Sequence, residues 1–293
     1  MYIVYCIEAV DIELTEVQRH GKESGILETA TKLRNSLTDN NISKLEFNDK
    51  YSDVIKIKNK KVVQSYVTME ENNFGESMII AHTNKKVASY NRKVRDYLYP
   101  NNDGIKVGEK LIVMVNKYYN DVQYLNGEFI YVKKVKEESI IRKLNIKNKE
   151  NEKTEVILKF KTIHVANAID DTEDNWSEVI VYENLLDSDE NNIGLLEKQA
   201  LLVDFKIRNP SLSAGTFDFD RALANDHLYN ALPVKYGYAI TCHKAQGSEW
   251  ENVYVDLEIS MNPRSEDYYR WVYTAITRAK KQLYLVELEL FKL

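Results

Sequence analysis

Apolar residues in the first part of the chain are spaced as in short helices and strands. Residues 24–38 carry them three and four positions apart, which predicts a helix with Ser24 as its N-cap. Residues 53–67 alternate between apolar and polar side chains, which predicts a pair of strands around Asn59. This part of the chain therefore predicts both kinds of secondary structure.

A predicted strand and a predicted helix then follow without a break. The run 78–81 is apolar and predicts a buried strand, and Thr83 is a suitable cap for a helix that Pro100 ends. The C-terminal part repeats this arrangement, with strands expected at 236–241, 251–259 and 282–290 and a helix at about 266–279. Strands that alternate with helices are typical of a parallel α/β sheet.

The middle of the chain has the pattern of antiparallel strands. Asn126-Gly127 is a strong hairpin-turn signal between two strand-like runs, 110–115 and 128–135. Further strands are expected at 154–165 and 177–183, and no helical spacing separates them before about residue 190. We therefore predict a small antiparallel β module at residues 105–188, inserted into an α/β domain formed by residues 1–104 and 189–293.

The distribution of charge adds to this division. The formal net charge of −5 gives no general sign of a nucleic-acid-binding protein. Residues 106–161, however, hold 13 Lys and Arg against 8 Asp and Glu, whereas residues 170–190 hold 9 acidic residues and no basic ones. These stretches are either two solvated faces or, in the basic half, a surface that contacts phosphate.

Cysteine content and hydropathy predict a cytoplasmic protein that does not interact with membranes. Cys6 and Cys242 lie far apart, and we expect both to be reduced. No apolar run approaches the roughly 20 residues of a membrane helix. The first residues lack the basic segment and cleavage site of a signal peptide.

The stretch TCHKAQGSE, residues 241–249, places polar side chains directly after an expected buried strand. Ligands of open α/β sheets bind at the carboxyl ends of the strands. Thr241 and Lys244 can donate to phosphate oxygens, and Glu249 can accept from a ribose hydroxyl. Gly247 permits a tight turn. Alone, this stretch only suggests a phosphate-binding site.

Two arginines lie where expected helices and strands meet. Arg278 ends a helix directly before a strand, where an arginine can stabilise charge on a transferring phosphoryl group. Beside Lys280 and Lys281 it can equally be an ordinary surface residue. Arg19 follows an expected strand and precedes a helix, which makes it a second candidate for contact with phosphate.

These stretches occur together in an order that is characteristic of one family. The chain resembles the C-terminal half of superfamily 1B DNA helicases of the RecD/Dda type, with a UvrD-like C-terminal domain. LTEVQRHGKESGILETATKLR resembles the motif IV region, AITCHKAQGSEWENVYVDL resembles motif V, and YTAITRAKKQLYLV resembles motif VI. MIIAHTNKKVASYNRKVR is similar to the family's next strand and helix, and GEKLIVMVNKYYNDVQYLNGEFIYVKKV to the start of its SH3-like module.

The resemblance implies a second RecA-like motor domain with an SH3-like insertion, in an ATP-dependent DNA helicase. It implies that Arg19 and Arg278 reach the γ-phosphate of the nucleotide. It also implies that Glu249 and Gly247 lie at the nucleotide and that Gln246 couples the nucleotide site to the DNA site. The implied contacts with the backbone of single-stranded DNA are Thr83, Asn84, Thr241, His243 and Lys244.

The sequence lacks the phosphate-binding P-loop of such a motor. Its one Gly-Lys pair is Gly21-Lys22, where Glu16 replaces the required first glycine and Glu23 follows the lysine. We therefore expect ATP and Mg²⁺ to bind only together with an N-terminal RecA-like domain of the same polypeptide, and neither to bind this chain alone.

Two other interpretations remain open at this point. The chain can be a stand-alone, non-catalytic module that binds single-stranded nucleic acid or a protein partner, or part of an RNA-directed helicase. His243 can contact the strand or be a buried histidine. We expect Tyr90, Tyr97, Trp250, Trp271 and Cys242 to be packing residues rather than ligand contacts.

Overall fold

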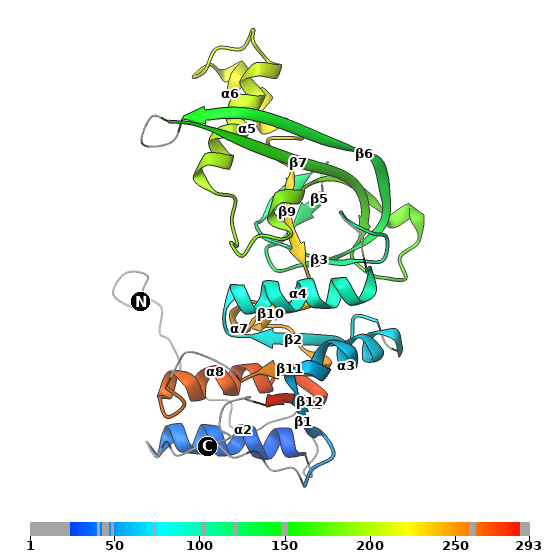
Figure 1. Cartoon of the computed structure of the whole chain (residues 1–293), viewed down its shortest axis with the longest axis vertical. Helices are drawn as coiled ribbons and strands as arrows, with labels where there is room; N and C mark the ends of the chain where they lie inside the picture. Colours follow the sequence, from blue (N-terminus) through cyan, green and yellow to red (C-terminus); the bar gives the residue numbers. More distant parts are fainter. Residues whose placement is uncertain are drawn as a thin grey trace, which may run out of the picture.

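The computed structural model describes residues 24–39, 42, 47, 50–72, 74–100, 104–119, 122–147, 152–257 and 262–287. They form a parallel-sheet module and a β-barrel module, which lie one above the other in Figure 1. Among the helices of these ranges, none is long and apolar enough to cross a membrane.

The first module contains a five-stranded sheet in the order β1, β12, β11, β2, β10, and every neighbouring pair runs parallel. The strands are β1 (Val54–Lys58), β2 (Ser77–Ala81), β10 (Ala239–Thr241), β11 (Trp250–Asp256) and β12 (Ala279–Glu287). The α/β fold predicted from the alternation of strands and helices is therefore confirmed.

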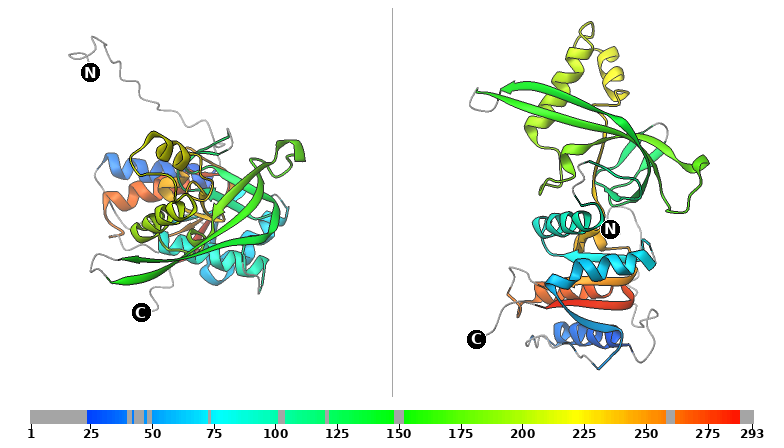
Figure 2. Two further views of the ribbon diagram at one scale, coloured as in Figure 1. Left: turned by 90° about the horizontal axis from the view of Figure 1, so that it is seen from above. Right: turned by 45° about the vertical axis from the view of Figure 1, so that its right-hand side comes forward.

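Helices cover both faces of this sheet because successive side chains of a strand point to opposite sides. Met78 and Ile80 of β2 pack in one cluster with α2 (Gly25–Thr38) and α8 (Glu266–Ile276). Ile79 and Ala81 pack in the other with α3 (Asn59–Asn72) and α4 (Asn84–Leu98). The layers are visible in Figures 1 and 2. Burial on both faces explains the uninterrupted apolar run at 78–81.

Two predicted helix starts are confirmed. Ser24 caps α2 by accepting a hydrogen bond from the Leu27 amide at 3.2 Å. Thr83 caps α4 by accepting from the Lys86 amide at 3.2 Å. Each bond satisfies an amide of the first turn that has no partner within the helix.

The predicted strand pair at 53–67 is wrong in its second half. β1 ends at Lys58, and α3 begins at the next residue. Val62 and Tyr66 lie four positions apart and are completely buried against the sheet. Over so short a segment, alternation did not distinguish a strand from a helix with one apolar face.

The second module is a closed barrel of strands in the order β3, β6, β7, β8, β9. These are β3 (Lys110–Val113), β6 (Phe129–Lys147), β7 (Lys153–Ala166), β8 (Ser177–Tyr182) and β9 (Leu232–Tyr236). Neighbours are antiparallel except for β8 and β9, which run parallel. β6 and β7 continue past the barrel as a long hairpin, as Figures 1 and 2 show.

The Asn126-Gly127 turn lies between β3 and β6, which pair antiparallel as predicted. Gly127 has a φ of 93°, a region that glycine adopts without steric cost. A small pair of strands, β4 (Lys117–Tyr119) and β5 (Val122–Tyr124), occupies the same connection and was not predicted.

The barrel extends beyond residue 188, the predicted end of the inserted module. After the short 3₁₀ helices η1 (Glu173–Asn175) and η2 (Glu183–Leu185), the chain forms α5 (Leu195–Arg208) and α6 (Phe217–Ala224) and then the barrel strand β9. The helical spacing of α5 suggested a return to the α/β domain. The helix instead contacts β6 and β7 of the barrel, and its buried residues Ala200 and Leu201 belong to the same core cluster as Leu144 and Leu158 of that hairpin.

The predicted strand 236–241 is divided between the two modules. Tyr236 ends β9 in the barrel, and Ala239 begins β10 in the parallel sheet. Asn91 of α4 holds this joint, because its Oδ1 accepts from the amides of Tyr238 at 3.0 Å and Ala239 at 2.7 Å. Space around Gly237 is also tight, since an added Cβ would lie 3.1 Å from the Phe129 ring. The chain therefore passes from barrel to sheet through a packed joint.

Candidate functional site

The predicted site residues divide between two opposite edges of the parallel sheet. Thr241 and Ala81 are the paired last residues of β10 and β2, so they mark the carboxyl edge. Trp250 and Ala279 are the paired first residues of β11 and β12, so they mark the amino edge. At about 3.3 Å per residue, a strand as long as β11 separates the edges by roughly 20 Å.

Most of the predicted nucleic-acid contacts lie together at the carboxyl edge. Asn84, Thr241 and Lys244 line one small pocket between the sheet and the barrel. Thr83 is exposed beside Asn84, and its hydroxyl keeps a proton to donate while it caps α4. His243, on the short helix α7 (Cys242–Ala245), is exposed, which excludes the buried-histidine alternative. The edge therefore offers neutral donors and an ammonium group to an anion.

Lys244 also joins the sheet module to the barrel. Its Nζ lies 3.0 Å from Oδ1 of Asn126, in the turn before β6, and 3.7 Å from the sulfur of Met114. Burial lowers the pKa of the Lys244 amine. An ammonium group has three protons to donate, so a phosphate oxygen can bind without loss of the Asn126 contact.

Lys235 lines the same pocket, and sequence reasoning missed it. Its side chain is buried, and its Nζ donates to the carbonyls of Ser188 at 2.7 Å and Glu190 at 2.6 Å. Burial lowers the pKa of the amine to about 8. The only sequence signal is a lysine within an apolar strand, because its burial depends on closure of the barrel.

Arg278 lies at the amino edge, directly before β12. Its Nε donates to the Thr274 carbonyl at 3.0 Å, as a basic residue does when it caps the last carbonyls of a helix. Its Nη1 donates to the Ser248 carbonyl at 3.2 Å and so ties the end of α8 to the turn after α7. The guanidinium is therefore fixed at this edge while remaining partly exposed.

Residues 242–249 connect the two edges. Cys242, at the carboxyl edge, is buried and contacts the Trp271 carbonyl at 3.6 Å, and burial raises the pKa of its thiol to about 11, as for a packing residue. Gln246 is exposed in the middle of the connection. Gly247 has a φ of 87°, so any other residue there would strain the turn. The coupling role expected of Gln246 stays a prediction.

Of the other residues predicted for the nucleotide site, the structure describes Glu249 but not Arg19. Glu249 is exposed at the amino edge, with its carboxylate 3.1 Å from Nζ of Lys280. Arg19, the second predicted arginine, lies outside the described residues, as does Cys6. The site at the amino edge therefore rests on Arg278 and Glu249.

Aromatic residues near these edges are mostly core, as expected. Trp250, Trp271 and Tyr90 are buried, but Tyr97, near the end of α4, is 54% exposed. The Tyr90 hydroxyl donates at 2.9 Å to Asp256, a buried carboxylate at the end of β11 that sequence reasoning also missed.

Solved structures of Pif1 helicases are similar to most of this chain. Pif1 from Bacteroides in complex with ADP-AlF3 and ssDNA is 13% identical, with 93% of this chain and 51% of that chain covered and a TM-score of 0.40. Pif1 from Candida albicans is 12% identical, with 90% and 53% covered and a TM-score of 0.30. The chain thus spans about half the length of these helicases.

Sequence relatives match a shorter part of the chain. An uncharacterized protein of Methanocaldococcus jannaschii is 45% identical over 53 residues, which are 18% of this chain and 4% of that protein. Residues 236–286 match the UvrD-like helicase C-terminal domain. This range contains Thr241, His243, Lys244, Glu249 and Arg278. The matching range therefore includes residues of both sheet edges and the connection between them.

Proposed function

We propose that this chain is the second RecA-like motor domain of an ATP-dependent DNA helicase in the RecD/Pif1-like branch of superfamily 1B. The barrel is its SH3-like insertion. The carboxyl edge of the sheet grips single-stranded DNA, and the amino edge presents Arg278 to a nucleotide. The observation that carries this proposal is the connection 242–249, because it joins both edges within the UvrD-like segment.

The proposed grip on the strand is independent of base sequence. Thr83, Asn84, Thr241 and Lys244 offer hydroxyl, amide and ammonium donors, which suit phosphate oxygens. His243 is exposed beside them. Contacts of this kind hold the backbone and leave the bases unread. Bacteroides Pif1 was solved with ssDNA, which makes DNA the first choice over RNA for this chain.

The proposed nucleotide site is shared with another domain. Arg278 offers a guanidinium to the γ-phosphate and Glu249 a carboxylate to a ribose hydroxyl, with Arg19 proposed as the second arginine. The sequence contains no P-loop, and the described part of the chain contains no cluster of three metal-ligating side chains. ATP and Mg²⁺ would therefore be held mainly by the N-terminal RecA-like domain of the same polypeptide. Bound ATP supplies the phosphoryl group, and this chain's arginines stabilise its charge.

The purified chain is expected to bind single-stranded oligonucleotides weakly, with an affinity that falls as salt is added. Lys244→Ala should lower the slope of log affinity against log salt by about 0.7, which is roughly a fivefold loss at about 0.1 M salt. Fluorescence anisotropy with labelled oligo(dT) and with a mixed sequence measures both quantities. The same titration with RNA decides which nucleic acid is preferred.

Asn126→Ala is the matched control for Lys244→Ala. It removes the barrel partner of Lys244 but keeps the ammonium group, so the salt slope should stay at the wild-type value. An affinity that does not change with salt concentration would contradict binding through the nucleic-acid backbone. So would a loss of affinity in Lys244→Ala that depends on base sequence.

The purified chain is expected to hydrolyse no ATP, with or without single-stranded DNA. The P-loop amides, its lysine and Mg²⁺ supply most of the grip on the nucleotide, and an arginine adds catalysis only after the nucleotide is bound. A coupled phosphate-release assay measures this. DNA-stimulated turnover that disappears in Arg278→Ala would show that the chain holds ATP by itself.

A stand-alone, non-catalytic binding module, the alternative function, would also hydrolyse no ATP. It is favoured by the helix-capping contact of Arg278, which needs no nucleotide. The reading frame upstream of the Met1 codon separates the two. An in-frame P-loop supports the motor, and its absence supports the binding module.

A further inference from the structure

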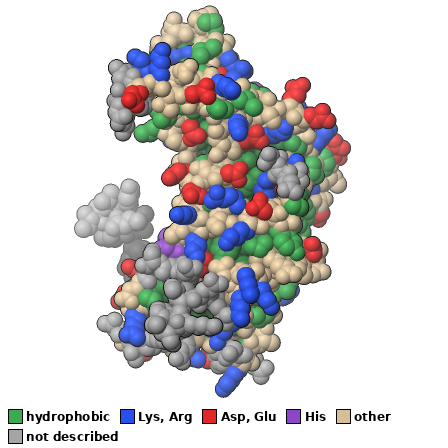
Figure 3. Space-filling view, in the orientation of Figure 1, with side chains coloured by type: hydrophobic (Ala, Val, Ile, Leu, Met, Phe, Trp, Pro, Cys, Tyr) green, Lys and Arg blue, Asp and Glu red, His purple; other side chains and the backbone are tan. Residues whose placement is uncertain are grey.

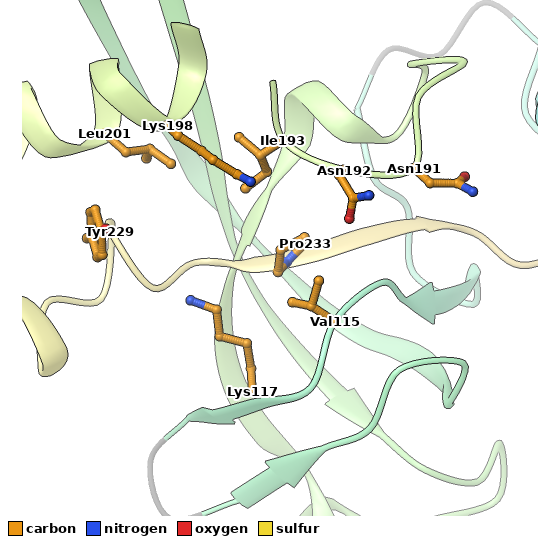
Figure 4. Close-up of a pocket in the computed structure, with 9 residues that line it drawn as sticks. All are labelled: Val115, Lys117, Asn191, Asn192, Ile193, Lys198, Leu201, Tyr229 and Pro233. Atoms are coloured by element: carbon orange, nitrogen blue, oxygen red, sulfur yellow. The ribbon is translucent and has the colours of Figure 1, made fainter. Parts of the chain in front are cut away.

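A cavity of about 250 Å³ lies between the barrel and α5 (Figure 4). Two lysines extend into it from opposite sides, Lys117 from β4 and Lys198 from α5. Tyr229 closes one side of it. The other lining residues are Val115, Asn191, Asn192, Ile193, Leu201 and Pro233. The cavity thus combines apolar walls with two cationic groups.

Nothing inside the cavity neutralises these two charges. None of the lining residues is acidic. Nζ of Lys117 lies 3.0 Å from Oδ1 of Asn230, a neutral group, and burial lowers the pKa of its amine. Within the part of the chain that the structure describes, Lys198 forms no ion pair. Lys198 is exposed at the rim of the cavity, whereas the ammonium group of Lys117 is partly buried without a countercharge and would be stabilised by an anion.

The cavity adjoins the proposed strand-binding edge. Asn191 lines both the cavity and the small pocket that Thr241 and Lys244 line. Pro233 and Lys235, two residues apart on β9, line the cavity and the pocket respectively. In the space-filling view, basic side chains lie where the barrel and sheet modules meet, with acidic side chains among them (Figure 3). A strand that leaves the carboxyl edge can therefore continue past Asn191 toward Lys117 and Lys198.

We propose that this cavity is a nucleotide subsite, with one phosphate between the ammonium groups of Lys117 and Lys198 and the attached base against Tyr229. That the nucleotide belongs to a bound single strand rests on the proposed function. A free nucleotide would offer the same phosphate and base to this cavity. The volume of about 250 Å³ lies just below the roughly 300 to 1,000 Å³ of drug-sized ligand sites, which limits the occupant to one nucleotide unit at most. Stacking on an aromatic ring is tolerant of base identity, as expected for a strand bound without sequence preference.

The test is anisotropy of labelled oligo(dT) with the whole chain and variants on both sides of the cavity. Lys198→Ala and Lys117→Gln should each lower the salt slope by about 0.7, roughly a fivefold loss of affinity at about 0.1 M salt. Lys206→Ala is the matched control, because Lys206 is exposed on the same helix but does not line the cavity. It should bind as the wild type does. Thermal melts by circular dichroism check that each variant is folded.

Photocrosslinking locates the base independently of affinity. An oligo(dT) in which one thymine is replaced by 5-iodouracil should crosslink to Tyr229, as read by mass spectrometry. Tyr229→Phe should keep the affinity and Tyr229→Ala should lose roughly tenfold, within the range for one stacked base. Crosslinks confined to other residues would overturn the proposal.

The outcomes separate this proposal from the proposed function. Binding weakened by Lys244→Ala but not by Lys117→Gln or Lys198→Ala leaves strand binding in place and overturns the subsite. If the wild type binds no oligo(dT), the proposed function fails, and NMR titration with thymidine monophosphate and inorganic phosphate tests the cavity alone. Binding of the monophosphate that Lys198→Ala removes supports a free-nucleotide site. No binding of either probe overturns the subsite as well.

Discussion

Arg278→Ala is expected to slow ATP turnover by about 10³- to 10⁵-fold in a polypeptide that joins this chain to a P-loop domain. The reason is that charge spreads over the γ-phosphoryl oxygens in the transition state, and a guanidinium placed there stabilises it. The loss corresponds to about 4 to 7 kcal/mol at about 1.36 kcal/mol per factor of ten. Arg278→Lys should not restore turnover, because an ammonium lacks the planar fork. Steady-state ATPase assays measure both variants.

Binding of single-stranded DNA should be spared in the same variants, because Arg278 and Thr241 lie at opposite edges of the sheet. Lys281→Ala is the matched control. It removes a neighbouring cation that pairs with Glu251 at the surface, and turnover should stay within about twofold. If turnover falls less than tenfold in Arg278→Ala while thermal stability drops, Arg278 acts only through its bonds to the Thr274 and Ser248 carbonyls.

Arg95→Ala is expected to lower the free energy of unfolding by about 3 to 5 kcal/mol, because it leaves a buried carboxylate without its cation. Nε of Arg95 lies 2.8 Å from Oε1 of Glu109, and the two side chains are only 10% and 0% exposed. Arg95 also lies over the Tyr236 ring at 4.9 Å, and Glu109 accepts from the Lys106 amide at 2.8 Å. The pair joins α4 to the start of the barrel. Urea denaturation followed by circular dichroism measures the loss.

Arg92 provides a control on the same helix. Its ion pair with Asp189 has a similar length, 3.0 Å, but both side chains are 49% exposed. Arg92→Ala should therefore cost about 0 to 1 kcal/mol. The combined replacement Arg95→Met with Glu109→Leu should recover most of the stability, because no lone charge is left buried. Equal losses of unfolding free energy in Arg92→Ala and Arg95→Ala would mean that burial does not strengthen the Arg95–Glu109 ion pair.

Local patterns predicted the elements whose neighbours lie close in sequence. Ser24 and Thr83 are visible as caps because a cap and its helix are adjacent. The apolar run 78–81 and the helix at 266–276 follow from the same local rules. The pattern failed at β9 and α5, because whether a strand closes a barrel or extends a sheet depends on partners far along the chain. Nothing near residue 232 indicates that β9 pairs with β3.

The site was predictable as a set of residues but not as an arrangement. The sequence order of Thr241 to Glu249 placed these side chains near sheet edges. It did not show that the stretch crosses from one edge to the other, because that follows from the parallel pairing of β11 with β2 and β12. The contact between Lys244 and Asn126, 118 residues apart, has no local signal either. The roles expected for Gln246, Glu249 and Arg19 remain predictions.

The packed joint between β9 and β10 is one of the two places where the chain crosses between the modules. Asn91 bonds to both amides that follow Gly237, and the Phe129 ring fills the space beside that glycine. Arg95 and Glu109 hold the other crossing between the modules, where the chain enters the barrel. Because both crossings are held by buried contacts, we expect the barrel and the sheet to rotate together as one rigid body. A small rotation at the amino edge would then displace Lys147 and Lys153, the outer ends of β6 and β7, by an amount that grows with their distance from the sheet.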